Sequence, residues 1–429
     1  MTPRALVLTS DRSGAGKTVI SLGLMRALRN AGHKIRAAKS GPDYIDPRFH
    51  EAATGHPSVN LDAWAMDANT LCEKATNQGG DLLLIEGAMG VLDCASDGLG
   101  SVADLAEALG APVVVALDVS KQAQSAALAI AGLRSLRPAI KVAGVILNRV
   151  GSQKHVQMAR TVIEDQGWPV LGAVIRDNAL ALPERHLGLV QAAEMADLQI
   201  FLNQAADRVT ANIDLGALAA RARPLAQPAF PGKTLAPIGQ RIAVAQDVAF
   251  AFAYPHVLAD WRRAGAEILP FSPLANEAPD GDADAVYLPG GYPELHAARL
   301  SSAATFRGEM KKAAEDGTRI YGECGGYMVL GDALLDADRK SHSMLGLLPV
   351  VTSFAERRLS LGYRRLDPQQ GAPWSCPLLG HEFHYASVVE EGAADPLYSA
   401  TEAHGGAKFS MGLRRANVSG SFAHVIGPA

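Results

Sequence analysis

The chain has 429 residues, of which 48% are hydrophobic and 20% charged, and its formal net charge is −4 at pH 7. This length predicts two or three domains, and the negative charge argues against a nucleic-acid coat or an anionic-membrane binder, which need a basic face. No apolar run reaches the roughly 18 residues of a membrane span, and the N-terminus lacks the cleavage site of a signal peptide. Four dispersed cysteines without a CxxC pair are typical of a cytoplasmic protein and give no zinc-site spacing.

The first half of the chain alternates strand-like and helix-like segments. Short β-branched runs bounded by Gly, Asp or Pro are typical of strands buried on both faces of a parallel sheet, and they lie at 4–9, 81–86, 112–118 and 142–148. Between them, 18–32 and 101–110 have helical spacing and end near a glycine. This order predicts a doubly wound α/β domain over residues 1–221.

Residues 222–240 carry four prolines and no clear apolar period, and therefore predict a linker. A second alternation of strands and helices begins at Arg241. Two of its strand-like runs end in glycine-rich turns, at 285–291 and 318–326. We therefore expect a second α/β domain over 241–429.

The stretch from Ser10 to Thr18, SDRSGAGKT, lies between the first strand and the first helix. This is the context of a phosphate-binding loop, in which backbone N–H groups bind anionic oxygens and a lysine adds positive charge. The residues expected to bind ATP are Ser13, Gly14, Ala15, Gly16, Lys17 and Thr18, with the Thr18 hydroxyl on Mg²⁺. The alternative is a tight turn with a solvent-exposed lysine.

Polar residues follow three of the predicted strands, namely Glu86, Asp118 and Asn148. Ligands of open parallel sheets sit at the carboxyl ends of the strands. A carboxylate there can hold Mg²⁺, and the Asn148 amide can bind adenine. Each residue alone could equally be a cap or turn residue.

Charged residues crowd the segment AAKSGPDYIDPRFH, residues 37–50. Lys39, Asp43, Asp46 and His50 stand beside a glycine and two prolines, which predicts a charged loop. Near a triphosphate, such a loop could bind a carboxylate substrate and a metal together. A solvated loop is the alternative.

The segment from Gly322 to Gly326 has the form G-x-C-x-G after a strand. This pattern is the nucleophile elbow with Cys324 in place of serine. A helix N-terminus lowers the pKa of a thiol, so we expect Cys324 to be activated as a thiolate. A buried structural cysteine is the alternative.

A cysteine nucleophile needs an oxyanion hole and a base. The N–H groups of Gly325 and of Gly290 or Gly291 are candidates for the oxyanion hole. Position alone does not decide between the candidate bases, which are His381, His384, His404 and His424.

Six segments together resemble the a,c-diamide synthases of cobalamin biosynthesis: SGAGKT, SGPDYIDPRFH, LIEGAMGVLD, LPGGYPELHA, GECGGYM and GHEFHY. The resemblance covers essentially the whole chain. It implies an N-terminal P-loop domain like dethiobiotin synthetase and a C-terminal domain like class I glutamine amidotransferases. The family's loop carries an extra residue before its GxGKT end, and Ser10 stands where relatives often have glycine.

The resemblance also implies residue roles. Cys324 becomes the nucleophile, His424 its base, and Gly291 and Gly325 the oxyanion donors. Class I amidotransferases usually have a glutamate two residues after the histidine; here that residue is Ile426, so the third triad member stays unassigned. The implied metal ligands are Thr18, Asp43 and Glu86. The residues implied around the substrate carboxylate are Asp43, Tyr44, Asp46 and Asp93, and we expect Lys39 of the charged loop to bind it as well.

The implied activity is amidation of the a and c carboxylates of hydrogenobyrinate, with ATP, Mg²⁺ and glutamine and through acyl phosphates. Alternatives are cobyrinate or nickel sirohydrochlorin as substrate, or a P-loop ATPase switch with an inert amidotransferase-like tail. The family implies a homodimer, and we expect no nucleic-acid or membrane partner. The basic run 357–365 predicts a solvated surface, with binding of substrate carboxylates as the alternative.

Overall fold

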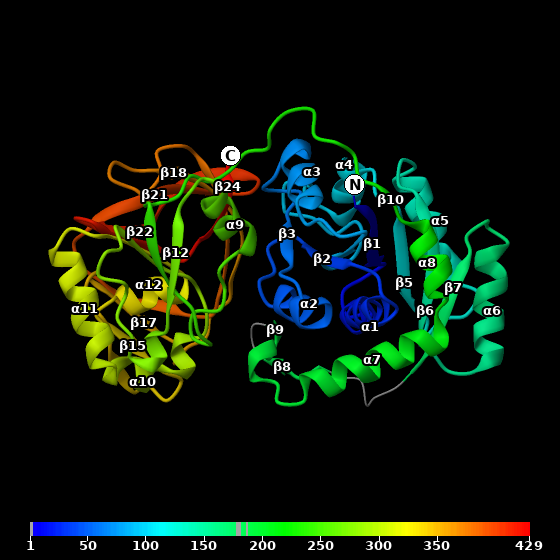
Figure 1. Ribbon diagram of the computed structural model, residues 1–429, viewed down its shortest axis with the longest axis horizontal. Coiled ribbons are helices and arrows are strands. Elements are labelled where there is room, and N and C mark those ends of the chain that lie inside the picture. The colour runs from blue at the N-terminus through cyan, green and yellow to red at the C-terminus, as the bar shows by residue number, and fades with distance from the viewer. Residues whose placement is uncertain (1–2, 177–181, 186–187) are drawn as a thin grey trace. The chain divides into compact units, whose positions relative to one another are not determined.

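The computed structural model describes residues 3–176, 182–185 and 188–429, and the chain divides into two compact units (Figure 1). The first unit extends to Lys233 and the second begins at Thr234. This division falls inside the segment 222–240 that the prolines mark as a linker. Each unit is described by itself.

The first unit contains a mainly parallel sheet in the order β3-β2-β4-β1-β5-β6-β7. Figure 1 shows helices on both of its faces, α3 and α4 on one and α1 and α7 on the other. The prediction of a doubly wound α/β domain is therefore confirmed. The strands are β1 (Arg4–Ser10), β2 (Ile35–Ser40), β3 (Val59–Leu61), β4 (Leu82–Glu86), β5 (Val113–Asp118), β6 (Val142–Val150), β7 (Val170–Ile175), β8 (Glu184–Arg185), β9 (Gly188–Leu189) and β10 (Arg223–Pro224).

The helices of the first unit follow most strands, as the βαβ rule requires. They are α1 (Lys17–Asn30), α2 (Asp46–Thr54), α3 (Ala68–Thr76), α4 (Val102–Leu109), α5 (Ala126–Leu136), α6 (Gln153–Glu164), α7 (Leu198–Asn212) and α8 (Leu215–Arg221), with a 3₁₀ turn at Ala192–Glu194. Helix α1 packs against α7 and α2. None of the helices in the described residues has the length and apolar character that a membrane crossing needs.

Much of the segment 222–240 is hydrogen-bonded to one of the two units. Strand β10 pairs antiparallel with β1, and the N–H of Gly232 donates to Glu73 Oε2 at 2.6 Å. Farther along, the indole of Trp374 donates to the carbonyl of Ala236 at 2.8 Å. The segment is thus extended but fixed by hydrogen bonds to one unit or the other.

The second unit is built on a ten-stranded sheet in the order β12-β11-β13-β14-β23-β22-β21-β18-β19-β24, with a smaller sheet of β16-β15-β17-β20. Strands β12 to β23 in this order are parallel, and the remaining pairs are antiparallel. The parallel part is the α/β core that the sequence predicts. Its strands are β11 (Arg241–Ala245), β12 (Glu267–Phe271), β13 (Ala285–Leu288), β14 (Arg319–Glu323) and β23 (Val418–Ser421).

The other strands are β15 (Ala333–Leu335), β16 (Ser341–Ser343), β17 (Val350–Ser353), β18 (Ser360–Pro368), β19 (Leu378–His384), β20 (Ser387–Glu391), β21 (Asp395–Glu402), β22 (Gly405–Arg415) and β24 (His424–Pro428). The helices are α9 (Pro255–Arg263), α10 (Ala297–Ser302), α11 (Ala304–Glu315) and α12 (Gly325–Leu330), with 3₁₀ turns at Pro273–Ala275 and Pro293–Leu295.

A glycine allows the close approach of α1 to α7. A Cβ added to Gly23 would lie 2.6 Å from Val209 Cγ2 and 2.7 Å from the carbonyl oxygen of Ala205. We predict that Gly23→Ala lowers the free energy of unfolding by about 1–3 kcal/mol, the usual cost of overpacking a core. Gly132→Ala in helix α5 is the matched control, because nothing lies within 4 Å of its added Cβ. The control should be neutral or stabilising by about 0.5–1 kcal/mol. Urea denaturation of both variants measures the difference, and equal stabilities would contradict this account of the α1–α7 contact.

Candidate active sites

The phosphate-loop candidate connects β1 to α1 through two glycines in the left-handed region. Gly14 has a φ of 72° and Gly16, the N-cap of α1, a φ of 83°. A Cβ on Gly16 would lie 2.5 Å from Nδ2 of Asn148. That amide donates to the carbonyl of Ala15 at 2.7 Å. Asn148 thus supports the loop directly from the end of β6, a contact that the sequence does not indicate.

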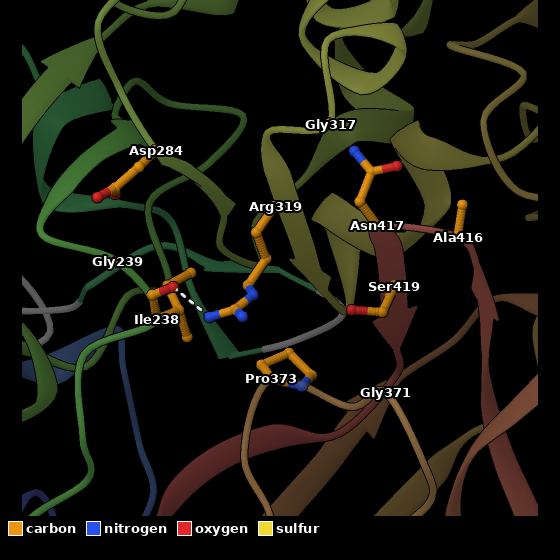
Figure 2. A pocket seen from close by; sticks show the side chains of 10 residues that line it. All are labelled: Ile238, Gly239, Asp284, Gly317, Arg319, Gly371, Pro373, Ala416, Asn417 and Ser419. Atoms are coloured by element: carbon orange, nitrogen blue, oxygen red, sulfur yellow. Dashed lines mark hydrogen bonds between the residues drawn. The ribbon is translucent and has the colours of Figure 1, made fainter.

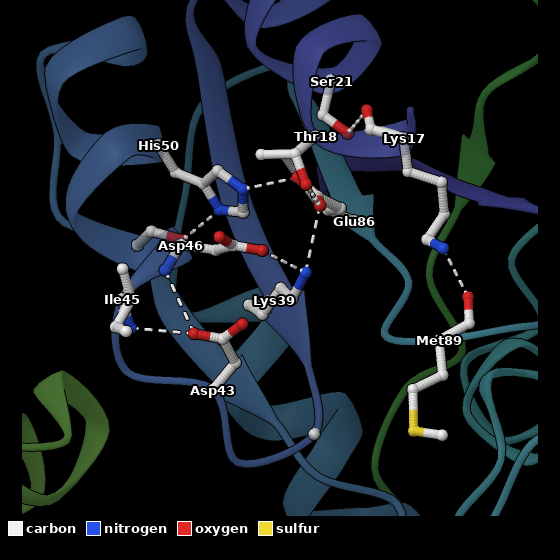
Figure 3. A network of polar contacts seen from close by, with 12 residues as sticks. Lys17, Thr18, Ser21, Lys39, Asp43, Ile45, Asp46, His50, Glu86 and Met89 are labelled. Atoms are coloured by element: carbon white, nitrogen blue, oxygen red, sulfur yellow. Dashed lines mark hydrogen bonds and ion pairs between the residues drawn. The ribbon is translucent and has the colours of Figure 1, made fainter. Parts of the chain in front are cut away.

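Lys17 is buried and turned back along the loop. Its Nζ donates to Ser10 Oγ at 2.9 Å. It also donates to the carbonyl of Met89 (Figure 3). Burial, together with the nearby charge of Lys39, lowers the pKa of Lys17 to about 8. The alternative of a tight turn with a solvent-exposed lysine is therefore wrong. An anion bound in the loop would find this cation close to its backbone N–H groups.

A buried charged cluster lies beside the loop, and Glu86 is at its centre (Figure 3). Glu86 Oε1 accepts from Thr18 Oγ1 at 2.9 Å and lies 3.0 Å from Lys39 Nζ. Its other oxygen, Oε2, lies 2.8 Å from Nε2 of His50. Lys39 also pairs with Asp46 Oδ2 at 2.5 Å. The segment 37–50 is therefore not a solvated loop; much of it belongs to β2 and α2.

The pKa shifts in this cluster follow from burial and mutual pairing. Burial opposes the charge of Glu86, but Lys39 and His50 outweigh it and hold the pKa of this carboxyl well below its usual range. The carboxylates of Asp46 and Glu86 likewise outweigh burial and raise the pKa of Lys39. The cluster thus keeps at least one cation and one anion in the interior, each stabilised by the other.

Of three residues expected at the substrate, Asp43 and Tyr44 lie next to the charged cluster and Asp93 does not. Asp43 Oδ1 accepts the N–H groups of Ile45 and Asp46 at 2.8 and 3.1 Å, so it holds the turn that leads into α2. Tyr44 is buried in the same turn. Asp93 is exposed and accepts from the N–H of Gly90 at 2.7 Å, and none of its hydrogen bonds in the described residues reaches the charged cluster. Thus the structure brings Asp43 and Tyr44 next to the cluster, while Asp93 lies outside it.

The oxygens of Thr18 and Glu86 fit a magnesium ion, which takes few protein oxygens and completes its shell with water and phosphate. Among the described residues, there is no group of three or more His, Cys, Asp or Glu side chains that could hold a metal. The carboxylate of Asp43 already accepts two backbone N–H groups through one oxygen. Of the three predicted metal ligands, Thr18 and Glu86 are hydrogen-bonded to each other.

Two arginine side chains that no sequence motif indicates also hold the phosphate loop. Arg149 adopts a left-handed φ of 55° and its guanidinium donates to the carbonyl of Gly14 at 3.0 Å and to Asp118 Oδ2 at 2.7 Å. Arg12 pairs with the same carboxylate at 3.1 Å. Asp118, predicted only as a strand-end carboxylate, therefore anchors two arginines at the loop.

In the second unit, the G-x-C-x-G segment makes the predicted sharp turn from β14 into α12. Cys324 has a φ of 46° and a ψ of −105°, an uncommon conformation for a residue with a side chain. A Cβ on Gly326 would collide with the carbonyl of Leu288, and one on Gly322 would lie 2.8 Å from the carbonyl carbon of Gly326. Glycine is therefore required on both sides of the elbow.

Of the four candidate bases, His424 lies next to the candidate nucleophile. A Cβ on Gly290 would collide with the ring of His424 and would lie 3.2 Å from Cβ of Cys324. The side chains of His424 and Cys324 therefore both lie against Gly290. A Cβ on Gly325 would lie 2.9 Å from the backbone nitrogen of Gly291. The two predicted oxyanion donors are thus adjacent to each other and to the cysteine.

The other histidines have different surroundings. His384 bonds Glu382 at 2.8 Å and stacks on Phe422, and His404 is exposed. His381 faces His424 across the β19–β24 pair.

In the basic run, Arg364 pairs with Glu382 at 2.7 Å. Arg357, Arg358 and Arg365 are exposed, as a solvated surface predicts.

The prediction that the helix N-terminus lowers the pKa of the Cys324 thiol is wrong. Cys324 is 2% exposed, and burial raises the pKa of its thiol well above the ordinary value. Burial, with His381 and His384 nearby, lowers the pKa of His424 to about 3. Both shifts favour the uncharged forms of the thiol and the imidazole at pH 7. The six-residue α12 does not compensate for the lost solvation.

A cavity of about 470 Å³ lies at the opposite end of the same parallel strands (Figure 2). It is lined by the amino ends of β13, β14 and β23, whereas Cys324 follows the carboxyl end of β14. Its polar side chains hold the backbone: Arg319 donates to the carbonyl of Ile238 at 2.6 Å, and Asn417 to that of Thr318 at 2.6 Å. The cavity is therefore separate from the predicted chemistry.

Comparison with known proteins gives matches to both halves of the chain. The family described as the CobQ/CobB/MinD/ParA nucleotide binding domain matches residues 6–190, and the CobB/CobQ-like glutamine amidotransferase domain matches 241–428. Full-length relatives carry the name hydrogenobyrinate a,c-diamide synthase. That of Rhizobium meliloti (strain 1021) is 53% identical over 98% of this chain and 98% of its own. That of Brucella abortus biovar 1 (strain 9-941) is 53% identical over 99% and 98%, and that of Mesorhizobium japonicum is 50% identical over 100% of both chains.

The charged cluster generates a stability prediction. Lys39→Met would leave Asp46 and Glu86 buried without their shared ammonium, and we expect a loss of about 3–5 kcal/mol in the free energy of unfolding. Lys408→Met is the matched control, because Lys408 is exposed and pairs with the exposed Asp367. Its loss should be at most about 1 kcal/mol. Chemical denaturation of both variants at pH 7 measures these losses. Equal losses in the free energy of unfolding would mean that Lys39 does not stabilise the cluster.

Proposed function

The chain belongs to the family of the hydrogenobyrinate a,c-diamide synthases, and from this premise we propose that it amidates the a and c carboxylates of hydrogenobyrinate with ATP and glutamine. The observation that carries the proposal is the presence of two complementary sites in one chain. One combines a phosphate loop with a buried charged cluster, and the other places a cysteine and a histidine at a strained elbow. A ligase that takes nitrogen from glutamine needs both.

In the first site, ATP would convert each substrate carboxylate into an acyl phosphate, because oxide is a poor leaving group and phosphate a good one. Backbone N–H groups of Ser13 to Gly16 and the ammonium of Lys17 would stabilise the charge of the transferring phosphoryl group. Lys17, with a pKa of about 8, is mainly protonated at pH 7, and phosphate would favour that form further. Thr18 and Glu86, with Asp43 nearby, would hold Mg²⁺, which when bound neutralises phosphate charge.

The charged cluster is the proposed binding place of the substrate carboxylate. Lys39 and Asp46 would bind and orient it, with Asp43 and Tyr44 in the adjoining turn and Asp93 on the loop that follows Glu86. Support comes from the hydrogen bond between Thr18 and Glu86, which joins this cluster to the phosphate loop. A carboxylate held here would lie close to a nucleotide bound in the loop.

In the second site, the thiol of Cys324 would attack the carboxamide carbon of glutamine while His424 takes its proton. The N–H groups of Gly291 and Gly325 would bind the resulting oxyanion. Collapse of this intermediate, with the proton returned by His424, would release ammonia and leave a glutamyl thioester, which water hydrolyses to glutamate. The ammonia would then displace phosphate from the acyl phosphate and form the amide.

The alternatives receive less support. The relatives reported above all carry the metal-free substrate in their name, so cobyrinate and nickel sirohydrochlorin are not favoured. An inert amidotransferase-like tail would not need the glycines, the strained cysteine and the adjacent histidine of the elbow. We retain the glutamine-hydrolysing ligase as the function.

Family membership also supports the proposal of a cytoplasmic homodimer that acts on small molecules without a nucleic-acid partner. The mass of the purified protein in solution, measured by light scattering, should be twice that of one 45.0 kDa chain. A monomer mass at micromolar concentration would contradict the dimer.

The division of labour between the two sites predicts opposite phenotypes for two substitutions. Cys324→Ala should reduce glutamine-dependent diamide synthesis at least about 10³-fold, because the nucleophile is lost, and leave synthesis from ammonium salts within about twofold. Lys17→Ala should instead abolish synthesis from either nitrogen source. Mass spectrometry of the products formed from hydrogenobyrinate measures both the glutamine-dependent and the ammonia-dependent synthesis.

Cys376→Ala is the matched control, because Cys376 is a free, exposed cysteine of the same unit, and it should behave as the unmodified chain. Loss of ammonia-dependent synthesis in Cys324→Ala, or its retention in Lys17→Ala, would contradict the assignment of the two sites.

A further inference from the structure

Glu323 precedes the candidate nucleophile and lies beside the candidate base. It is the last residue of β14, and its Oε2 lies 3.9 Å from Nδ1 of His424. Its other oxygen, Oε1, accepts the N–H of Val425, the residue after His424, at 3.0 Å. The carboxylate is therefore fixed to the same strand that carries the histidine. Both side chains are almost fully buried, with exposures of 3% and 0%.

Two tyrosines hold this carboxyl group in place. The hydroxyl of Tyr287 donates to Oε2 at 2.7 Å and that of Tyr321 to Oε1 at 3.2 Å. Tyr321 is in turn within 3.2 Å of the hydroxyl of Tyr398. With Val425, three donors thus satisfy the two oxygens. A buried acid with this many partners has a defined orientation, which a residue that must orient another group requires.

We infer that Glu323 is the positioning residue of His424 and supplies the third member of the Cys324–His424 system that Ile426 does not supply. The inference rests on the proposed function. A carboxylate at Nδ1 holds the imidazole so that its Nε2 can take the thiol proton, and it stabilises the imidazolium that forms. The separation of 3.9 Å is longer than a hydrogen bond, as is common for catalytic contacts before substrate binds.

The surroundings of His424 explain why an anion is needed there. His381 and His384 both act against a positive charge on His424, and burial does so more strongly. Glu382 is paired with His384 and Arg364. Glu323 is the acidic group whose carboxylate lies next to the His424 ring. Burial, opposed by its bonds to Tyr287, Val425 and Tyr321, raises the pKa of Glu323 to about 7. It is therefore ionised above pH 7 and increasingly protonated below it.

The test is Glu323→Gln, which keeps the shape of the side chain and removes its charge. The glutamine-dependent kcat should fall about 10- to 10³-fold, less than the roughly 10⁴-fold loss known for an aspartate-to-asparagine change in a closely bonded triad. The KM for glutamine should stay within about threefold, and synthesis from ammonium salts should be unchanged. The unmodified chain should gain glutamine-dependent kcat as pH rises through about 7, and this rise should be absent in the variant.

Glu323→Asp, which retains a carboxylate, should recover part of the activity and the rise near pH 7. The inference is overturned if Glu323→Gln keeps the kcat and the pH profile within about twofold while Cys324→Ala is inactive with glutamine. It is also overturned if Glu323→Gln loses ammonia-dependent synthesis to the same extent, because the effect would then be structural. A Cys324→Ala variant that still hydrolyses glutamine would instead reject the proposed function itself.

Discussion

The buried carboxylate of Glu86 is the contact on which the first site depends. It accepts from the first turn of α1 through Thr18, from β2 through Lys39 and from α2 through His50. Three consecutive elements of the chain therefore meet at one side chain at the end of β4, which lies well beyond them in the sequence. An unpaired carboxylate at this depth would be strongly disfavoured, so the pairing both stabilises the unit and fixes the phosphate loop relative to the charged cluster.

The second site uses the same position in a parallel sheet but a different kind of constraint. Cys324 follows the carboxyl end of β14, as Glu86 ends β4, which is where open α/β sheets place their ligands. Here the glycines on both sides of Cys324 permit the strained turn, and burial keeps thiol and imidazole neutral until they react. The first site thus depends on paired charges, and the second on the suppression of charge.

Elements with a strong local pattern could be predicted from the sequence. The β-branched runs of β1, β4, β5 and β6, and the glycine-rich turns at Gly16 and Cys324, follow from local preferences. Segment 37–50 lacks such a pattern, because its prolines and charges are typical of a loop although Lys39 and Asp46 form a buried ion pair. The raised pKa of Cys324 cannot be predicted from the sequence, because burial arises from tertiary packing that a single sequence does not reveal. Glu323 gave no signal of its own, because the expected position for the acid was Ile426.

We propose that the two sites act one after the other to amidate two carboxylates of one substrate. The most direct measurement is the mass of the product formed from hydrogenobyrinate, ATP, Mg²⁺ and glutamine labelled with ¹⁵N in its amide, with cobyrinate in a parallel reaction. We expect a diamide of the metal-free ring that carries two labelled nitrogens, and much less product from the cobalt ring. Unlabelled amides, or no diamide from hydrogenobyrinate while ATP is hydrolysed, would contradict it.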